Sequence, residues 1–142
     1  MLRVVLDTVI LVRALINPYS IYGRIVFEHY RDYVLYVSPP IVAELLEVLR
    51  RPEISRKFRT MAGFDLRTVL DLIGQAEIVD PELKAVSRDP NDDMFLATAR
   101  AARAHCLVSE DQDLLSLREY EGTAIVNGPA LLQILRRDPA QH

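Results

Sequence analysis

Short apolar runs alternate with longer helical stretches along nearly the whole of this 142-residue chain. The runs are rich in β-branched residues and stand at 3–6, 34–37, 78–79, 106–108 and 123–126. Strands that are separated by helices pair in parallel through right-handed crossovers, which place helices on both faces of the sheet. The alternation therefore predicts a three-layer α/β/α fold with a central parallel sheet of about four to five strands.

Capping residues and prolines set the expected ends of the helices. Ser20 and Asp65 are typical N-caps, while Ser38-Pro39 and Pro52 place proline in a first helical turn. Gly63 is expected to end the helix that Pro52 begins. We expect helices at 9–16, 20–30, 39–49, 52–62, 66–76, 94–104, 111–117 and 128–137.

Length and composition predict one domain. Half of the residues are apolar, which is enough for a single core, so we expect residues 1–138 to form one domain and residues 139–142 a disordered tail. The first apolar run ends at Asp7, far short of a signal peptide or a membrane helix, and Cys106 has no second cysteine to pair with. We expect a cytoplasmic protein with no membrane partner.

The balance of charges limits the range of ligands. The formal net charge is −3, whereas general binding of nucleic acid depends on an excess of lysine and arginine. Any nucleic acid therefore needs a local basic patch or a bound metal ion.

Acidic residues follow two of the predicted strands. Asp7 comes directly after the first run, and Asp111 lies just beyond the run at 106–108. Taken singly, each is explained as the N-cap of the helix that follows, and Asp92 and Asp93 are explained in the same way as a cap and a first-turn acid. The carboxyl ends of parallel strands share one edge of a sheet, however, so Asp7 and Asp111 are expected at the same edge.

Glu44 has no such explanation, because it lies on the apolar stripe of its helix with Ile41, Leu45 and Val48. A buried carboxylate costs several kcal/mol unless it has a partner, which is either a basic side chain or a metal ion. Converging carboxylates repel one another by about 4 kcal/mol per pair at ~4 Å. Oxygen ligands without histidine or cysteine suit Mg²⁺ or Mn²⁺.

Four short motifs together carry a resemblance to a known family. The chain resembles the PIN-domain ribonucleases, in particular the VapC-related toxin components of prokaryotic toxin-antitoxin pairs, over essentially its whole length. Each motif is weak alone, and their order and separations carry the signal. The motifs are Val-Val-Leu-Asp-Thr at 4–8, Ser-Pro-Pro-Ile-Val-Ala-Glu-Leu at 38–45, Asp-Pro-Asn-Asp-Asp-Met-Phe-Leu-Ala-Thr-Ala at 89–99 and Leu-Val-Ser-Glu-Asp-Gln-Asp-Leu-Leu at 107–115.

The resemblance implies an acidic set that binds Mg²⁺ or Mn²⁺. For the third acid we prefer Asp93 because it stands three residues before Leu96 and four before Ala97, and Asp92 is kept as a neighbouring ligand. The implied catalytic and metal-binding residues are Asp7, Glu44, Asp93 and Asp111, with Thr8, Ser109 and Asp113 in supporting positions.

The resemblance further implies a function and its partners. It implies a metal-dependent endoribonuclease that acts as the toxin of a type II toxin-antitoxin pair, with an RNA substrate, a cognate antitoxin that blocks the acidic site, and a homodimer. Basic residues near the predicted site are candidates to hold RNA, although solvated helix faces are the better explanation for most of them. These candidates are Arg13, Arg50, Arg51, Arg56, Lys57 and Arg100.

Two other functions compete with this one. Family members often have Asn after Asp-Thr in the first motif, whereas this chain has Val9, which motivates a catalytically silent PIN-like module that binds RNA or protein. A phosphoacceptor signalling domain also gathers acids at a strand edge. It expects an acidic pair after the first strand and a lysine after the last, but here Asp7 stands alone and Asn127-Gly128-Pro129 follows the last run.

Overall fold

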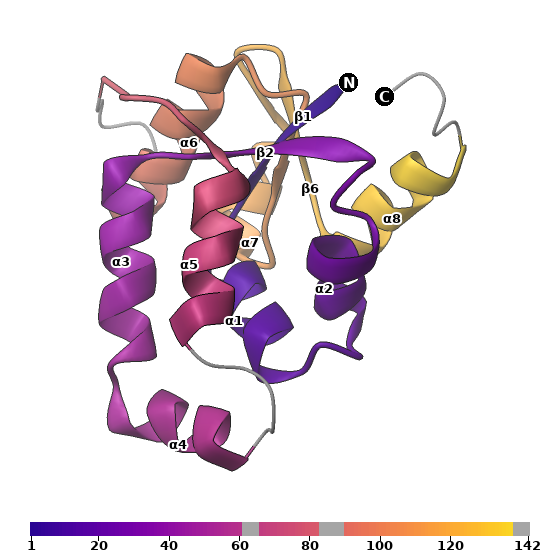
Figure 1. Ribbon diagram of the computed structural model, residues 1–142. Helices are drawn as coiled ribbons and strands as arrows, with labels where there is room; N and C mark the ends of the chain where they lie inside the picture. The colour runs from indigo at the N-terminus through magenta and orange to yellow at the C-terminus, as the bar shows by residue number, and fades with distance from the viewer. Residues whose placement is uncertain (61–65, 83–89, 138–142) are drawn as a thin grey trace.

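The central sheet of the protein has six strands in the order β3-β2-β1-β4-β6-β5 (Figure 1). The computed structural model describes residues 1–60, 66–82 and 90–137, with the backbone alone at 57–60, 66–70 and 90. All neighbouring strands are parallel except the pair β5–β6. The predicted parallel sheet is confirmed, and β5 is an additional antiparallel edge strand. The strands are β1 (Leu2–Leu6), β2 (Tyr33–Val37), β3 (Glu77–Ile78), β4 (Cys106–Val108), β5 (Glu119–Tyr120) and β6 (Thr123–Val126).

Helices connect these strands close to the positions that the capping signals predict. They are α1 (Thr8–Ile16), α2 (Ile21–Gly23), the π-helix η1 (Arg24–Glu28), α3 (Pro39–Leu49), α4 (Pro52–Thr60), α5 (Leu66–Gln75), α6 (Pro90–Ala102), α7 (Gln112–Leu115) and α8 (Gly128–Arg137).

Three of the expected boundaries differ or lie elsewhere. The helix expected at 20–30 consists of α2 and η1, and it ends when the N–H of His29 donates to the carbonyl of Arg24 five residues earlier. Helix α6 begins at Pro90 rather than at Met94, because proline fits a first helical turn. Gly63, Asp65 and the tail at 139–142 lie outside the described residues.

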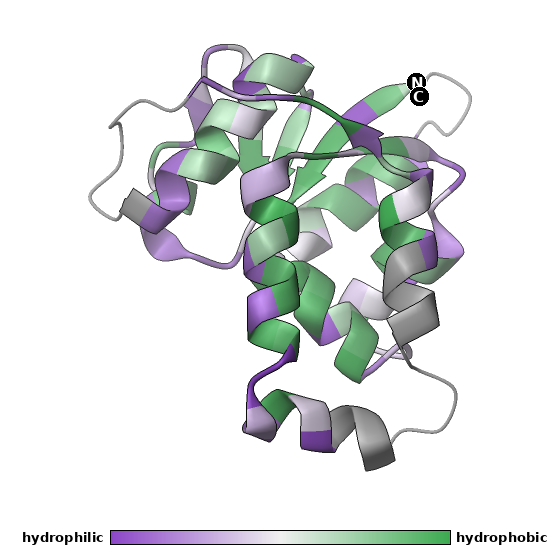
Figure 2. Ribbon diagram, turned by 60° about the vertical axis from the view of Figure 1, so that its left-hand side comes forward, coloured by the Kyte–Doolittle hydropathy of each residue, from purple (hydrophilic) through white to green (hydrophobic). Residues whose placement is uncertain are grey.

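The sheet separates two apolar cores, one on each face. Successive side chains of a strand point to opposite faces, so Val4 and Leu6 pack with the residues of α1, η1 and α8, whereas Val5 packs with those of α6 and α7. The strands between these two layers are coloured as hydrophobic in Figure 2. These two cores make the three-layer α/β/α arrangement that the sequence predicts.

The strand order places a topological switch point between β1 and β4. From β1 the chain moves to β2 and β3 on one side, and it then crosses to β4 on the other side of β1. A crevice opens where neighbouring connections leave in opposite directions, at the carboxyl ends of the two strands. Asp7 follows β1 at this point, and Ser109 follows β4.

Two helices beyond the sheet complete the surroundings of that crevice. Helix α3 begins at the sheet edge and α4 lies past the far end of α3, away from the strands (Figure 1).

Among the described residues no single helix is long and apolar enough to span a membrane. The one pair of neighbouring helices that passes by length and composition, α1 with Ile21–Glu28, is bent by 104°.

Candidate metal centre

Asp7 lies at the carboxyl end of β1 and is the N-cap of α1. Its Oδ1 accepts from the backbone N–H of Val9 at 2.8 Å, and its Oδ2 accepts from the Ser109 hydroxyl at 2.7 Å. Only 4% of Asp7 is exposed. Burial raises the pKa of Asp7, an effect that the two hydrogen bonds and the charge of Arg13 oppose and that Asp111 reinforces. The side chain of Asp7 is therefore both the N-cap of α1 and a buried acid of the site.

Glu44 points from α3 toward the start of α1. Its Oε2 accepts a hydrogen bond of 2.7 Å from the Thr8 hydroxyl, and its side chain is half-buried beside the fully buried Leu45. Among the residues that the structure describes, the hydrogen-bond partner of Glu44 is thus a neutral hydroxyl rather than an arginine. A hydroxyl fixes the orientation of a carboxylate but leaves its negative charge in place.

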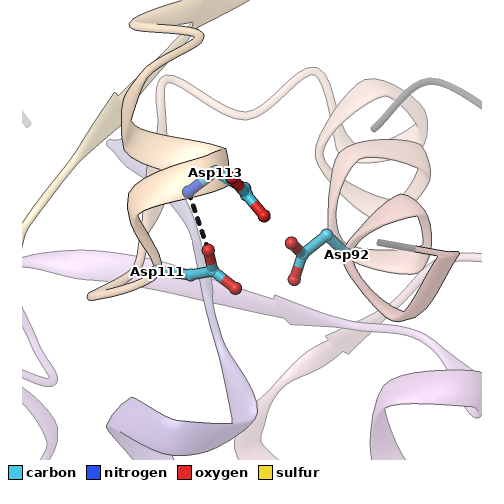
Figure 3. Close-up of side chains that lie close together, drawn as sticks. All are labelled: Asp92, Asp111 and Asp113. Carbon is cyan, nitrogen blue, oxygen red and sulfur yellow. Dashed lines mark hydrogen bonds between the residues drawn. The ribbon is translucent and has the colours of Figure 1, made fainter. Parts of the chain in front are cut away.

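Asp92, Asp111 and Asp113 bring their carboxylates together from two separate helices (Figure 3). One oxygen of each lies within 4.8 Å of the others. Asp111 is the N-cap of α7 and accepts from the N–H of Asp113 at 2.8 Å, while its own N–H donates to the Ser109 hydroxyl at 3.0 Å. Ser109 therefore links Asp7 to Asp111 through one side chain.

The structure places Asp92 at the site where the sequence reasoning preferred Asp93. Asp92 lines the cavity together with Phe95, which lies three residues later on the same face of α6. Asp93 is also buried, but it is turned by about 100° around the helix, as one residue of an α-helix requires, and is absent from the cavity lining. In this geometry Asp92, which the sequence offered as the neighbouring ligand, lines the cavity in place of Asp93.

A cavity of about 650 Å³ joins these groups at the switch point. Acids from four separate parts of the chain line it, namely Asp7, Glu44, Asp92 and Asp111, with Glu110 beside the last. Thr8 and Val9 line it as well, and Val9 is 46% exposed. Asp7 and Asp111, which are more than 100 positions apart in the sequence, thus line the same cavity.

The basic candidates divide into two groups. Arg13 and Arg51 line the cavity. Arg50 and Arg56 are exposed and do not line it, and Arg100 bonds the carbonyl of Glu82 and lies 3.6 Å from Glu121. The side chain of Lys57 lies outside the described residues.

Arg13 is held in place by Tyr22. The guanidinium carbon lies 5.4 Å from the centroid of the Tyr22 ring, and Nη1 donates to the Tyr22 hydroxyl at 3.2 Å. Sequence reasoning missed this pair, because the two residues lie on different helices and their spacing of nine carries no helical signal. It also missed the bond between Ser109 and Asp7, which depends on β1 and β4 being neighbours.

The lining fits a hard divalent cation. Every ligand atom that the acids offer is a carboxylate oxygen, and the described lining contains neither histidine nor cysteine. Such a set suits Mg²⁺ or Mn²⁺ better than zinc or copper.

Comparison with known proteins agrees with this geometry. Residues 3–113 match the family model described as PIN domain. The chain belongs to the PIN-domain family. The matched region contains all of the acids that line the cavity, and PIN domains are generally nucleases that use divalent metal ions.

Two individual proteins extend the comparison. An uncharacterized protein of Methanocaldococcus jannaschii, MJ1680, is 30% identical over 120 residues, which cover 83% of this chain and 76% of that protein. The crystal structure of VapBC2 from Rickettsia felis, bound to a DNA fragment from its promoter, contains a chain that is similar with a TM-score of 0.58 at 17% identity. That match covers 89% of this chain and 98% of the other, and it shows a shared fold.

Proposed function

We propose that this PIN-domain protein is a metal-dependent endoribonuclease that hydrolyses phosphodiester bonds of RNA. The observation that carries the proposal is the convergence of Asp7, Glu44, Asp92 and Asp111 on one cavity at the switch point of the sheet. Like charges gathered in a half-buried hollow destabilise the metal-free protein, so a divalent cation is the ligand that this arrangement favours.

The residues of the cavity take different parts in the proposed reaction. Asp7, Glu44, Asp92 and Asp111 would hold Mg²⁺ or Mn²⁺, with Asp113 next to the last two. When bound, such an ion polarises a phosphoryl oxygen and lowers the pKa of water. Ser109 and Thr8 orient Asp7 and Glu44 by their hydrogen bonds, and Arg13 and Arg51 supply positive charge for the phosphates.

The likeness to a VapBC2 chain supports a biological setting for this activity. We propose that the protein is the cytoplasmic toxin of a type II toxin-antitoxin pair, that it forms a homodimer, and that a cognate antitoxin covers the acidic cavity. This part of the proposal rests on the shared fold, because the sequence identity of 17% is low.

A cleavage assay tests the proposed chemistry. Purified protein with Mn²⁺ is expected to cut single-stranded RNA, and Asp7→Asn is expected to reduce the rate at least 100-fold, because asparagine keeps the N-cap but removes a charge from the metal site. The matched control is Asp71→Asn, an exposed aspartate on α5 that lies away from the acidic cavity. Expression of the unaltered protein is expected to arrest cell growth, and Asp7→Asn is expected to relieve the arrest.

The exposed Val9 favours a second candidate, a silent module that binds RNA or protein without cutting. That module predicts no cleavage of RNA with either ion and no effect of Asp7→Asn on growth. Observing both of these results would reject the nuclease proposal in favour of the module.

A further inference from the structure

The cavity offers more room than a metal site requires. A water molecule takes about 30 Å³ in the liquid, so an ion with six oxygen ligands needs roughly 200 Å³. The cavity measures about 650 Å³. More than half of the space therefore remains for another part of the substrate.

The additional space is lined by an apolar wall, which consists of Val9, Val12, Ile16, Val48 and Ile54. Val9, Val12 and Ile16 follow one another along a single face of α1, and Val48 lies one turn after Glu44 on α3. Ile54 comes from α4. Because α1 rises about 1.5 Å per residue, the wall extends roughly 10 Å from the neighbourhood of Asp7.

Two positive charges stand beside this wall. Arg13 follows Val12 on α1, and Arg51 precedes α4. Tyr22 holds the guanidinium of Arg13 through its ring and its hydroxyl, which reduces the entropy that Arg13 would lose on binding an anion. The chain as a whole carries a net charge of −3, and Arg51 already forms an ion pair with Glu47 at 3.0 Å. Within the described lining, Arg13 is therefore the cation that a phosphate would meet first.

An apolar surface next to a fixed arginine matches the two halves of a nucleotide, which are a flat base and a charged phosphate. We propose that the apolar wall seats one base of a single-stranded nucleic acid beside the bond that is cut, with the adjoining phosphate on Arg13. A base in a duplex is already stacked and paired, so only an unpaired strand presents its base to such a wall. This inference rests on the proposed nuclease function and specifies how its substrate is held.

A binding experiment tests the seat separately from catalysis. All proteins carry Asp92→Asn, so that the strand is not consumed, and bind fluorescent eight-residue strands in Mg²⁺. One strand is a mixed-sequence RNA, and the other is a ribose-phosphate strand without bases. We expect the RNA to bind at least tenfold more tightly than the baseless strand.

Variants then assign that difference to the wall. Val9→Ala and Ile54→Ala are each expected to weaken binding of the RNA three- to tenfold and to leave the baseless strand unchanged. Arg13→Gln is expected to weaken both strands by a similar factor. The controls are Ile78→Ala and Arg24→Gln, which alter exposed residues that do not line the cavity. Thermal unfolding confirms that each variant is folded.

The outcomes separate the two proposals. Equal affinity for the two strands would mean that the apolar wall does not bind a base and serves a protein partner instead. This result would contradict the proposed base site even if the unaltered protein cuts RNA. A base-dependent affinity that Val9→Ala reduces, together with no cutting by the unaltered protein, would support the seat and reject the nuclease function. Wall variants that weaken both strands equally would also overturn the seat.

Discussion

At the scale of single residues, Asp92 and Asp93 form a natural pair for locating the metal site. Both are buried acids of the first turn of α6, but only Asp92 lines the cavity. We expect Mn²⁺ at about 100 times its dissociation constant to raise the free energy of unfolding by ~2.7 kcal/mol. Asp92→Asn should remove most of this gain, and Asp93→Asn should retain it, as measured by urea unfolding with Mn²⁺ and with EDTA. An equal loss in both variants would contradict the assignment.

Asp7 is expected to make the stability of the metal-free protein depend on pH. Burial raises the pKa of Asp7 above its ordinary value of 3.8, so the folded state favours the neutral carboxyl. Its contribution to stability is present below pH 3.8 and is lost as the pH rises through the raised pKa of the folded protein. In EDTA, Asp7→Asn should therefore be more stable than the unaltered protein at pH 7.

This difference should disappear as the pH falls below 3.8. Urea unfolding between pH 3 and pH 7 measures it, and asparagine preserves the cap that Val9 requires. A variant that is less stable than the unaltered protein at pH 7 would contradict the burial argument.

The residues around Asp92 also show why the sequence did not decide between the two acids. Spacing to Leu96 and Ala97 favoured Asp93, but every residue from Phe95 to Ala99 is buried. A helix that is buried nearly all round has no polar face to set its rotation. The face turned toward the cavity is fixed by contacts with β1, β2 and β4, which no local pattern contains. For Glu44 the sequence did carry a local signal, because the buried residues Ile41 and Leu45 define one apolar stripe on α3, and Glu44 lines the cavity.

At the scale of elements, a pair of buried hydroxyls joins the two helices that carry Glu44 and Asp92. Ser38 stands at the N-cap position of α3, yet its hydroxyl bonds that of Thr98 on α6 at 2.7 Å instead of capping. Thr98 in turn donates to the carbonyl of Met94 at 2.7 Å. Both side chains are fully buried, so neither hydroxyl has water as an alternative partner.

Thr98→Val is expected to destabilise the protein by about 1–3 kcal/mol, because it leaves the Ser38 hydroxyl buried without its acceptor. The double variant Ser38→Ala with Thr98→Val should lose less than the sum of the two single changes. Urea unfolding measures the cycle, and Ser116→Ala, an exposed position, is the control. Strictly additive losses would show that the two hydroxyls do not act together.

Strand β5 shows the limit of sequence reasoning at the same scale. It pairs with β6 through the two-residue loop Glu121-Gly122, and both loop residues have positive φ, at 47° and 88°. A loop of this kind is usually signalled by Asn-Gly or Asp-Gly, so Glu-Gly carries a weaker signal. The other strands were predicted because each contains part of an apolar run, whereas β5 consists of Glu119 and Tyr120 at the edge of the sheet and contains no such run.

At the scale of the whole molecule, the distribution of charge predicts how RNA binding responds to salt. Only Arg13 and Arg51 among the described basic candidates line the cavity. For a single strand, each phosphate contact contributes about −0.7 to the slope of log K against log salt, so two contacts give roughly −1.4. Fluorescence anisotropy over a series of KCl concentrations measures the slope, and Arg13→Gln should make it shallower by about 0.7.

A much steeper slope would mean that Arg50, Arg56 and Lys57 also contact the strand.

The overall arrangement of layers could be predicted from the sequence, but the order of the strands could not. The alternation of runs specified three layers and one sheet edge for Asp7 and Asp111. The order of the strands depends on where β4 joins the sheet. Because β4 pairs with β1, Ser109 lies beside Asp7 and links it to Asp111.

The hydrogen bonds within the acidic cluster have a consequence for the choice of ion. Both oxygens of Asp7 and one oxygen each of Glu44 and Asp111 already accept a hydrogen bond from the protein. Carboxylates oriented in this way are suited to monodentate coordination, in which one oxygen binds the ion. Calcium favours bidentate carboxylates and seven or eight ligands. Magnesium favours six ligands at short distances and keeps several of its waters. We therefore expect the hydroxyls and caps that orient the acids to favour binding of Mg²⁺ or Mn²⁺ over binding of the larger Ca²⁺.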